Sequence, residues 1–233
     1  MILQIWRDVK QKKDKEQFER YRKVLKDNVP KKFEDFLELK YNNKERYGTL
    51  KHAYRVANQY ESNSGNMDPM KIVDLHDKAV ECKAKFTGKA RRKGNMAIME
   101  IDNKTYVANS QVHEVSDSGY VNFAGDKKTI VTAPDERRFE TLVVGHDRSV
   151  DSEYKLFEHA AMIAEDGKAH EIVMLSEKSM CESCQFVMQQ FKEKYPNVKV
   201  NVVSHKKKKS QKNRNQNPIF KIDVELRYKH ENN

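Results

Sequence analysis

The sequence predicts an α/β fold in which a mixed five-stranded sheet, with helices packed on it, follows a helical N-terminal region. The C-terminal part alternates short apolar runs, typical of strands, with longer stretches whose apolar residues recur every three or four positions. The resulting order, β-β-α-β-α-β-β, is one in which helices cover a sheet. The strands are expected at residues 95–101, 105–110, 170–175, 198–203 and 219–228, and the helices at 150–164 and 181–195.

Residues 1–88 are expected to form a charged helical region, separate from a second domain at 89–233. Lysine, arginine and glutamate dominate this region, and its sparse apolar residues are spaced as on one face of a helix. Asp68 followed by Pro69 is typical of a helix start, because aspartate caps the first turn and proline fits inside it. The helices expected here lie at residues 11–27, 33–39, 50–60 and 69–82.

Turn residues predict how the expected strands are connected. Asp102, Asn103 and Lys104 form a turn between the first two strands, which therefore make a hairpin. The segment 113–138 contains glycine and proline and is expected to be a loop. A short additional strand is expected at 139–144, outside the five counted above.

The chain is strongly basic, with a formal net charge of +10 and a pI of about 9.3. This charge favours a polyanionic partner, most simply nucleic acid. Residues 205–216 carry six Lys or Arg residues and no acid, so this loop is a candidate for following a phosphate backbone. A solubilising loop without a ligand is the alternative interpretation.

Membrane insertion and classical secretion are not predicted. The chain has no apolar run of about 18 residues, which a transmembrane helix needs. Its N-terminus lacks the basic segment and longer apolar run of a secretory signal. We therefore expect no membrane partner and a protein that is cytoplasmic as synthesised. Export by a pathway that recognises a different targeting signal is compatible with this expectation.

Cys181 and Cys184 form a CxxC motif at the start of an expected helix. Their spacing to Met188 and Phe191 puts all four residues on one helix face, so both thiols should point toward the sheet. Backbone amides and the helix dipole in the first turn favour thiolate, the form that binds zinc. Without a signal peptide, CxxC predicts a metal or redox site before a disulfide. Two inert buried cysteines are the alternative.

Asp151 and Glu153 stand at the start of the preceding expected helix. Glu153 heads an apolar stripe, where burying a carboxylate is costly without a partner or a task. Residues two positions apart do not share a helix face. The Asp151 side chain can therefore approach that of Glu153 only if Asp151 lies at the extreme N-terminus of the helix. The alternative is an N-cap aspartate followed by a first-turn acid.

Taken together, the two motifs predict a catalytic zinc site. Helices lying side by side on one sheet face would bring their N-termini together, so Asp151, Cys181 and Cys184 would offer one oxygen and two sulfur ligands. Three protein ligands with an open fourth position are the pattern of catalytic zinc, which makes water a nucleophile near neutral pH. Glu153, beside the ligands, would accept a proton from that water and return it to a leaving amine.

The stretches RSVDSEYKLFE (148–158) and CESCQFVMQQF (181–191), followed by Tyr195-Pro196-Asn197, resemble the zinc-dependent nucleic-acid or nucleotide deaminase superfamily. More narrowly, they are similar to the deaminase domains of bacterial polymorphic toxins. The resemblance covers roughly residues 90–230. Met180 stands where many members have proline, and Asp151 where histidine is commoner.

The resemblance implies a cytidine deaminase-like sheet, Zn2+ bound by Asp151, Cys181 and Cys184, and Glu153 as the acid/base. Asn109 or Ser110, at the end of the second strand, would contact a nucleotide; a purely structural strand end is the alternative. The implied function is a toxin effector domain that deaminates cytosine, rather than adenine, in DNA or RNA. An immunity protein would be its partner, and a target-cell cytoplasm its place of action after export.

Two other functions fit parts of the sequence. A thiol redox protein would use Cys181 and Cys184, although Glu182 and Ser183 are not the usual insert between such cysteines. A non-catalytic, basic nucleic-acid-binding module would use the positive charge alone. The sequence leaves open the role of residues 1–88.

Overall fold

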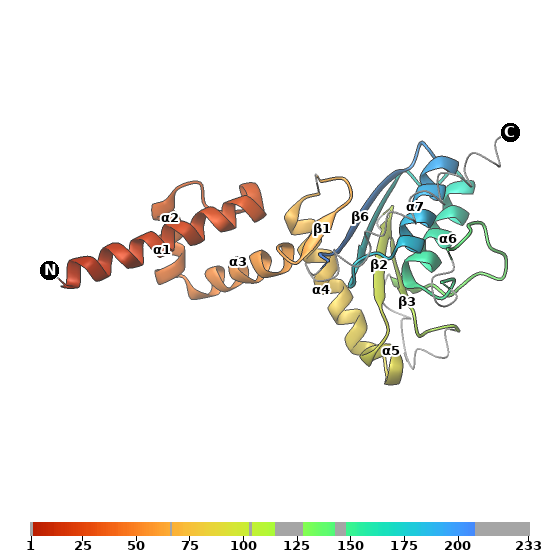
Figure 1. The fold of residues 1–233 in the computed structure, drawn as a ribbon, viewed down its shortest axis with the longest axis horizontal. Coiled ribbons are helices and arrows are strands. Elements are labelled where there is room, and N and C mark those ends of the chain that lie inside the picture. Colours follow the sequence, from red (N-terminus) through yellow and green to blue (C-terminus); the bar gives the residue numbers. More distant parts are fainter. Residues whose placement is uncertain (1, 66, 103, 115–127, 143–147, 208–233) are drawn as a thin grey trace, which may run out of the picture.

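The computed structural model describes residues 2–65, 67–102, 104–114, 128–142 and 148–207. Within them a six-stranded mixed sheet lies between helices, and α1–α3 extend away from it (Figure 1). The strands are β1 (Tyr60–Ser62), β2 (Met96–Ile101), β3 (Lys104–Asn109), β4 (Lys128–Ile130), β5 (Glu171–Ser176) and β6 (Lys199–His205). The helices are α1 (Ile2–Leu25), α2 (Phe33–Asn42), α3 (Lys44–Ala57), α4 (Pro69–Lys85), α5 (Gly88–Arg92), α6 (Ser152–Glu165) and α7 (Glu182–Lys194), with a 3-10 turn at Lys26–Asn28.

The strands lie in the order β1-β6-β5-β2-β3-β4. β2 and β3 form an antiparallel hairpin, and Asp102 in its turn takes a positive φ of 47°. β2 also pairs antiparallel with β5, so the first residue of β2 lies at the sheet end where β5 finishes. β5 and β6 run parallel, with α7 as the crossover between them. As a result, the start of β2, the end of β5 and the start of α7 meet at one end of the sheet.

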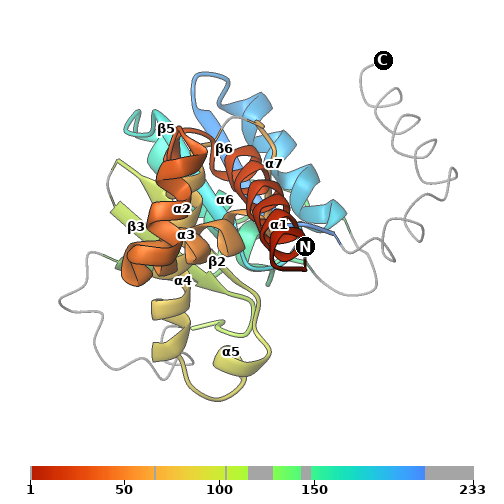
Figure 2. The ribbon, with the colours of Figure 1, turned by 90° about the vertical axis from the view of Figure 1, so that its left-hand side faces the viewer.

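The longer strands β2, β3, β5 and β6 send side chains to both faces of the sheet, into two apolar cores. Ile98, for example, belongs to the core beneath α4, and Met99 to the core beneath α6 and α7. α6 and α7 lie side by side on one face of the sheet, and α4 covers the other (Figure 1). Figure 2 shows α1–α3 in front of that second face. Phe36 and Leu75 of the N-terminal helices share one continuous core with Leu175 of the sheet.

The α/β fold with a helical N-terminal region is confirmed, while its finer arrangement differs from the prediction. Four expected strands and both C-terminal helices are present; the fifth strand, at 219–228, lies outside the described residues. Residues 139–142 do not form the expected strand, because the backbone N–H of Phe139 donates to the Glu158 carboxylate instead of a neighbouring strand. β4, by contrast, forms within the segment expected to be a loop, and β1 begins at residue 60, where the helix expected at 50–60 was to end.

The division between residues 88 and 89 stays a prediction. β1, which precedes it, pairs with β6, and the backbone and side chain of Asn63 both bond to Val202. α4 is held to the sheet by Lys71 and Lys78, which both pair with Glu100 of β2. Part of the first region therefore packs directly on the second.

None of the helices in the described ranges is both long enough and apolar enough to span a bilayer.

We expect Leu75→Ala to lower the free energy of unfolding by about 2–5 kcal/mol, because a fully buried leucine leaves a cavity between α4 and the sheet. Val80→Ala, also on α4 but 52% exposed, is the control and should change stability by less than about 0.5 kcal/mol. Urea unfolding followed by circular dichroism measures both. Equal, small effects would contradict the shared core.

Candidate active site

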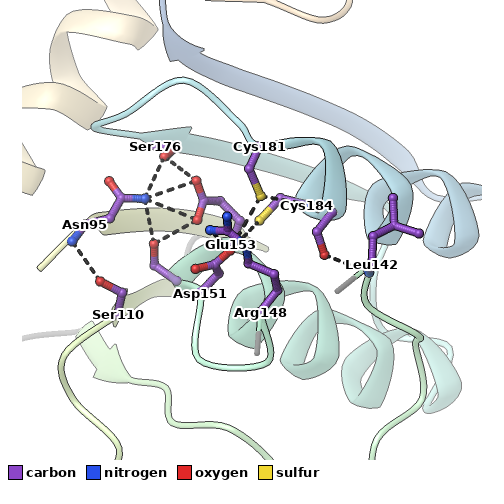
Figure 3. Close-up of polar contacts among 11 residues, drawn as sticks. Asn95, Ser110, Leu142, Arg148, Asp151, Glu153, Ser176, Cys181 and Cys184 are labelled. Carbon is purple, nitrogen blue, oxygen red and sulfur yellow. Dashed lines mark hydrogen bonds and ion pairs between the residues drawn. The ribbon is translucent and has the colours of Figure 1, made fainter. Parts of the chain in front are cut away.

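The N-termini of α6 and α7 meet above the end of the sheet where β5 finishes and β2 begins (Figure 3). α7 follows β5 after a short connection, and Cys181 is its N-cap. Asp151 is the N-cap of α6. These two helix starts bring Asp151, Cys181 and Cys184 together, as the sequence predicted.

The three candidate metal ligands form a compact group. A carboxylate oxygen of Asp151 and the Sγ atoms of Cys181 and Cys184 all lie within 4.8 Å of one another. Each Sγ atom is 3.5 Å from the same oxygen, Oδ2 of Asp151. Cys184 is buried, and the other two are half-buried. Two sulfurs and one oxygen therefore face a common point.

Asp151 occupies the N-cap position, as the alternative interpretation predicted, but its side chain does not cap the helix. Its backbone has the extended conformation of an N-cap, yet its carboxylate makes no capping hydrogen bond and turns to the thiols instead. An Arg148 guanidinium nitrogen lies 3.6 Å from Asp151 Oδ2 and supplies positive charge to it. In α7, by contrast, Sγ of Cys181 is the capping group and accepts from the backbone N–H of Cys184 at 3.3 Å.

The two thiols differ in acidity. Hydrogen bonding from Cys184, first by its side chain and also by its backbone N–H, lowers the pKa of Cys181 against the opposing effect of burial. The pKa of Cys184 is raised, because it donates to Cys181 and is buried. Cys181 is thus the thiol that ionises first, and a bound metal ion would deprotonate both.

Glu153 lies beside this group in a cradle of hydrogen-bond donors. Only 3% of its surface is exposed. Oε1 accepts from the Ser176 hydroxyl at 2.6 Å, and Oε2 from the Ser152 hydroxyl at 2.9 Å. Nδ2 of Asn95 donates to both oxygens, at 3.1 and 3.2 Å (Figure 3). The donors come from α6, the end of β5 and the residue before β2.

The environment of Glu153 favours its protonated form. Burial raises the pKa of this carboxyl, and the hydrogen bonds from Ser176 and Ser152 only partly oppose that effect. A carboxylate whose pKa is raised is a stronger base, which suits it to accept and return a proton.

Three buried polar groups fix the segments around the site. Glu158 accepts from the backbone N–H groups of Arg138 and Phe139 at 2.9 Å each. The Ser183 hydroxyl accepts from the backbone N–H of Leu142 at 3.0 Å. Lys155, fully buried, donates to two backbone carbonyls, that of Asn109 at the end of β3 and that of Val112 just after it. These hydrogen bonds anchor α6 and α7 to residues 138–142, and α6 also to residues 109–112.

The two predicted nucleotide contacts have internal partners. Asn109 is fully buried; its Nδ2 donates to the Ala90 carbonyl, and its Oδ1 accepts from the backbone N–H of Gln111. The Ser110 hydroxyl, half-buried, accepts from the backbone N–H of Asn95 at 2.9 Å. Ser110 thus lies next to the residue that contacts Glu153, whereas Asn109 fastens α5 to the sheet.

Comparison with protein families assigns the chain. The model of the toxin-deaminase family, described as the BURPS668_1122 family of deaminases, matches residues 80–206. The chain belongs to this family. The matched range contains the whole group of Asp151, Glu153, Cys181 and Cys184. Comparison of this deaminase with curated proteins and with solved structures finds no match.

Sequence reasoning missed Asn95 and Ser176, two donors to the buried carboxylate of the deaminase. Ser176 ends the apolar run of β5, and a polar residue that closes a buried strand next to a CxxC motif was the available signal. Asn95 had no comparable signal, because it follows a basic segment and precedes an apolar strand.

We expect Ser176→Ala to destabilise the deaminase by about 1–3 kcal/mol, because it removes a donor from a buried carboxyl group. The control is Ser204→Ala on β6, which faces Ser176 across the β5–β6 pair and makes no such contact with Glu153. In a Glu153→Ala background the cost of Ser176→Ala should fall. A cost that is unchanged by Glu153→Ala, measured by urea unfolding, would contradict the cradle.

Proposed function

We propose that the chain is a zinc-dependent hydrolytic deaminase that acts on cytosine in nucleic acid and serves as a toxin effector domain. Family membership provides the reaction class, hydrolytic deamination. One observation supports the zinc mechanism above all others: two thiol sulfurs and a carboxylate oxygen lie within 4.8 Å of one another, beside a buried glutamate.

The donor set fits zinc. Zinc accepts cysteine sulfur and carboxylate oxygen, and its catalytic sites use three protein ligands. Asp151, Cys181 and Cys184 supply such a set. When bound, the ion acts as a Lewis acid that makes water a competent nucleophile near neutral pH.

Glu153 is the proton carrier in this proposal. Its carboxyl lies next to the ligand group, and within the described residues its oxygens are bound by Ser152, Ser176 and Asn95. These donors hold the carboxyl in one orientation, and burial keeps its pKa raised. It therefore accepts a proton from the attacking water and delivers it to the departing amine.

The proposed substrate and setting follow from the charge of the chain and from the resemblance of its motifs. The net charge of +10 favours a nucleic acid, and a base within a polymer must be single-stranded or flipped to enter such a site. Cytosine in place of adenine follows from the resemblance of the sequence motifs. Ser110 remains the better placed of the two predicted nucleotide contacts. An immunity protein as a partner, and export to a target-cell cytoplasm, stay predictions.

We expect the purified wild-type protein to contain about one zinc ion per chain, and Cys184→Ser to lose it, because one of three ligands is removed. Cys82→Ser is the matched control; Cys82 is equally buried but lies on α4, outside the ligand group, so zinc should be retained. Elemental analysis measures both variants. Zinc-free wild-type protein, prepared without chelator, would contradict the metal mechanism and favour the thiol redox alternative.

We expect Glu153→Gln to lower deamination of a cytosine-containing single-stranded oligonucleotide by at least about 100-fold, because the amide cannot carry the proton. Its zinc content should stay at the wild-type level. Glu182→Gln, an exposed first-turn acid of α7, serves as the control and should remain active. Ammonia release and the mass of the product report the reaction. Full activity of Glu153→Gln would overturn the assigned role.

A further inference from the structure

We infer that Lys89, Arg91, Arg92 and Lys93 bind the phosphate backbone of a single-stranded nucleic acid beside the active site. These residues belong to α5 and its C-cap, and we call them the α5 basic surface. The inference rests on the proposed function, because it names the substrate class of that same site. It does not depend on the basic loop at 205–217, most of which lies outside the described residues.

The charge of this segment is concentrated and uncompensated. Between Glu81 and Glu100 the chain carries six Lys or Arg residues and no acid. Lys83 pairs with Glu177, and Lys85 with Glu81. The four side chains of the α5 basic surface are all exposed, and among the described residues none of them forms an ion pair.

The α5 basic surface lies close to the Glu153 carboxyl group, because the chain leads from this surface directly to Asn95, which contacts Glu153. Lys93 precedes Asn95 by two residues, and Nδ2 of Asn95 lies 3.1 Å from Glu153 Oε1. Consecutive Cα atoms are about 3.8 Å apart, so the Cα of Lys93 is within about 7.6 Å of that of Asn95. Figure 1 shows α5 beyond the end of the sheet where β2 begins, which is the end that carries the site.

α5 is also held in a fixed orientation. Ala90 is buried, and its carbonyl accepts from Nδ2 of the buried Asn109 at 3.0 Å. Gly94 packs so closely on the Asn109 side chain that any Cβ there would collide with it. Because these contacts bury the inner side of α5, its four cations point outward from a rigid base.

The chemistry fits a phosphate backbone better than other anions. Arginine binds phosphate through paired hydrogen bonds, and lysine through its charge. A membrane-binding helix would also need exposed apolar residues, and the one apolar side chain of α5, Ala90, is buried. A strand lying along these cations would pass beside Asn95, a half-buried donor to Glu153, and would bring a base close to that carboxyl group. A free nucleoside carries no phosphate group and would therefore not bind to this surface.

The test compares two variants that each remove four positive charges. One replaces Lys89, Arg91, Arg92 and Lys93 by glutamine. The control replaces Lys12, Lys13, Lys15 and Arg20, which are exposed on α1. Fluorescein-labelled single-stranded DNA and RNA of one cytosine-containing sequence are titrated with the full chain, and anisotropy is followed over a range of NaCl concentrations.

We expect the α5 variant to bind at least tenfold more weakly at low salt, and the control by less than a factor of two. The slope of log K against log salt should also be shallower by about 3 in the α5 variant, since four single-strand phosphate contacts contribute roughly 0.7 each. Whichever of DNA and RNA shows the larger loss is the polymer that this surface serves.

Equal effects in both variants would overturn the inference, as would undetectable binding by the wild-type protein. So would an α5 variant that binds both oligonucleotides normally but no longer binds phosphatidylserine vesicles, which would assign the surface to a membrane. The assay requires no turnover. Absence of deamination would therefore contradict the proposed function alone, and unchanged binding would contradict the α5 surface alone.

Discussion

The burial of one carboxyl group, that of Glu153, constrains the whole end of the sheet where β5 finishes and β2 begins. A buried carboxyl without donors would cost several kcal/mol, so each donor has to be brought to it. Ser152 comes from the same helix, Ser176 from the last position of β5 and Asn95 from just before β2. The antiparallel register of β2 and β5 is what places the last two side by side.

The metal-ligand group follows from the same arrangement. Glu153 lies in the first turn of α6, and the N-cap Asp151 lies just before it, with its carboxylate 3.5 Å from the Cys181 sulfur. α7 starts immediately after β5, so its first-turn cysteines reach the same point. Two helix N-termini then contribute favourable dipoles to ionised ligands. The proposed acid/base group and the proposed metal ligands are therefore positioned by the same packing of α6 and α7 on the sheet.

The sequence predicted what local patterns encode and missed what depends on distant partners. The strands β2, β3, β5 and β6 have apolar runs long enough to identify, and CxxC and Asp-x-Glu mark helix starts directly. β1 and β4 are three residues long and exist only because a neighbouring strand pairs with them. Asn95 and Ser176 meet across 81 positions of sequence, a contact no local pattern reveals. The sequence likewise shows where the positive charges lie, but not what each of them contacts. In the structure, Lys155 is buried and donates to a backbone carbonyl, whereas the cations of α5 face solvent.

Through β1, the N-terminal region covers an edge of the sheet. The family match begins at residue 80, after β1, although β1 covers the outer side of β6 over Val203–His205. A fragment cut at that point would leave a parallel-sheet strand with a row of open N–H and C=O groups, a template for pairing with other chains. β1 itself is too short to serve as such a template. By pairing with β6, the segment that precedes the matched range covers part of a sheet edge of the kind that promotes aggregation when exposed.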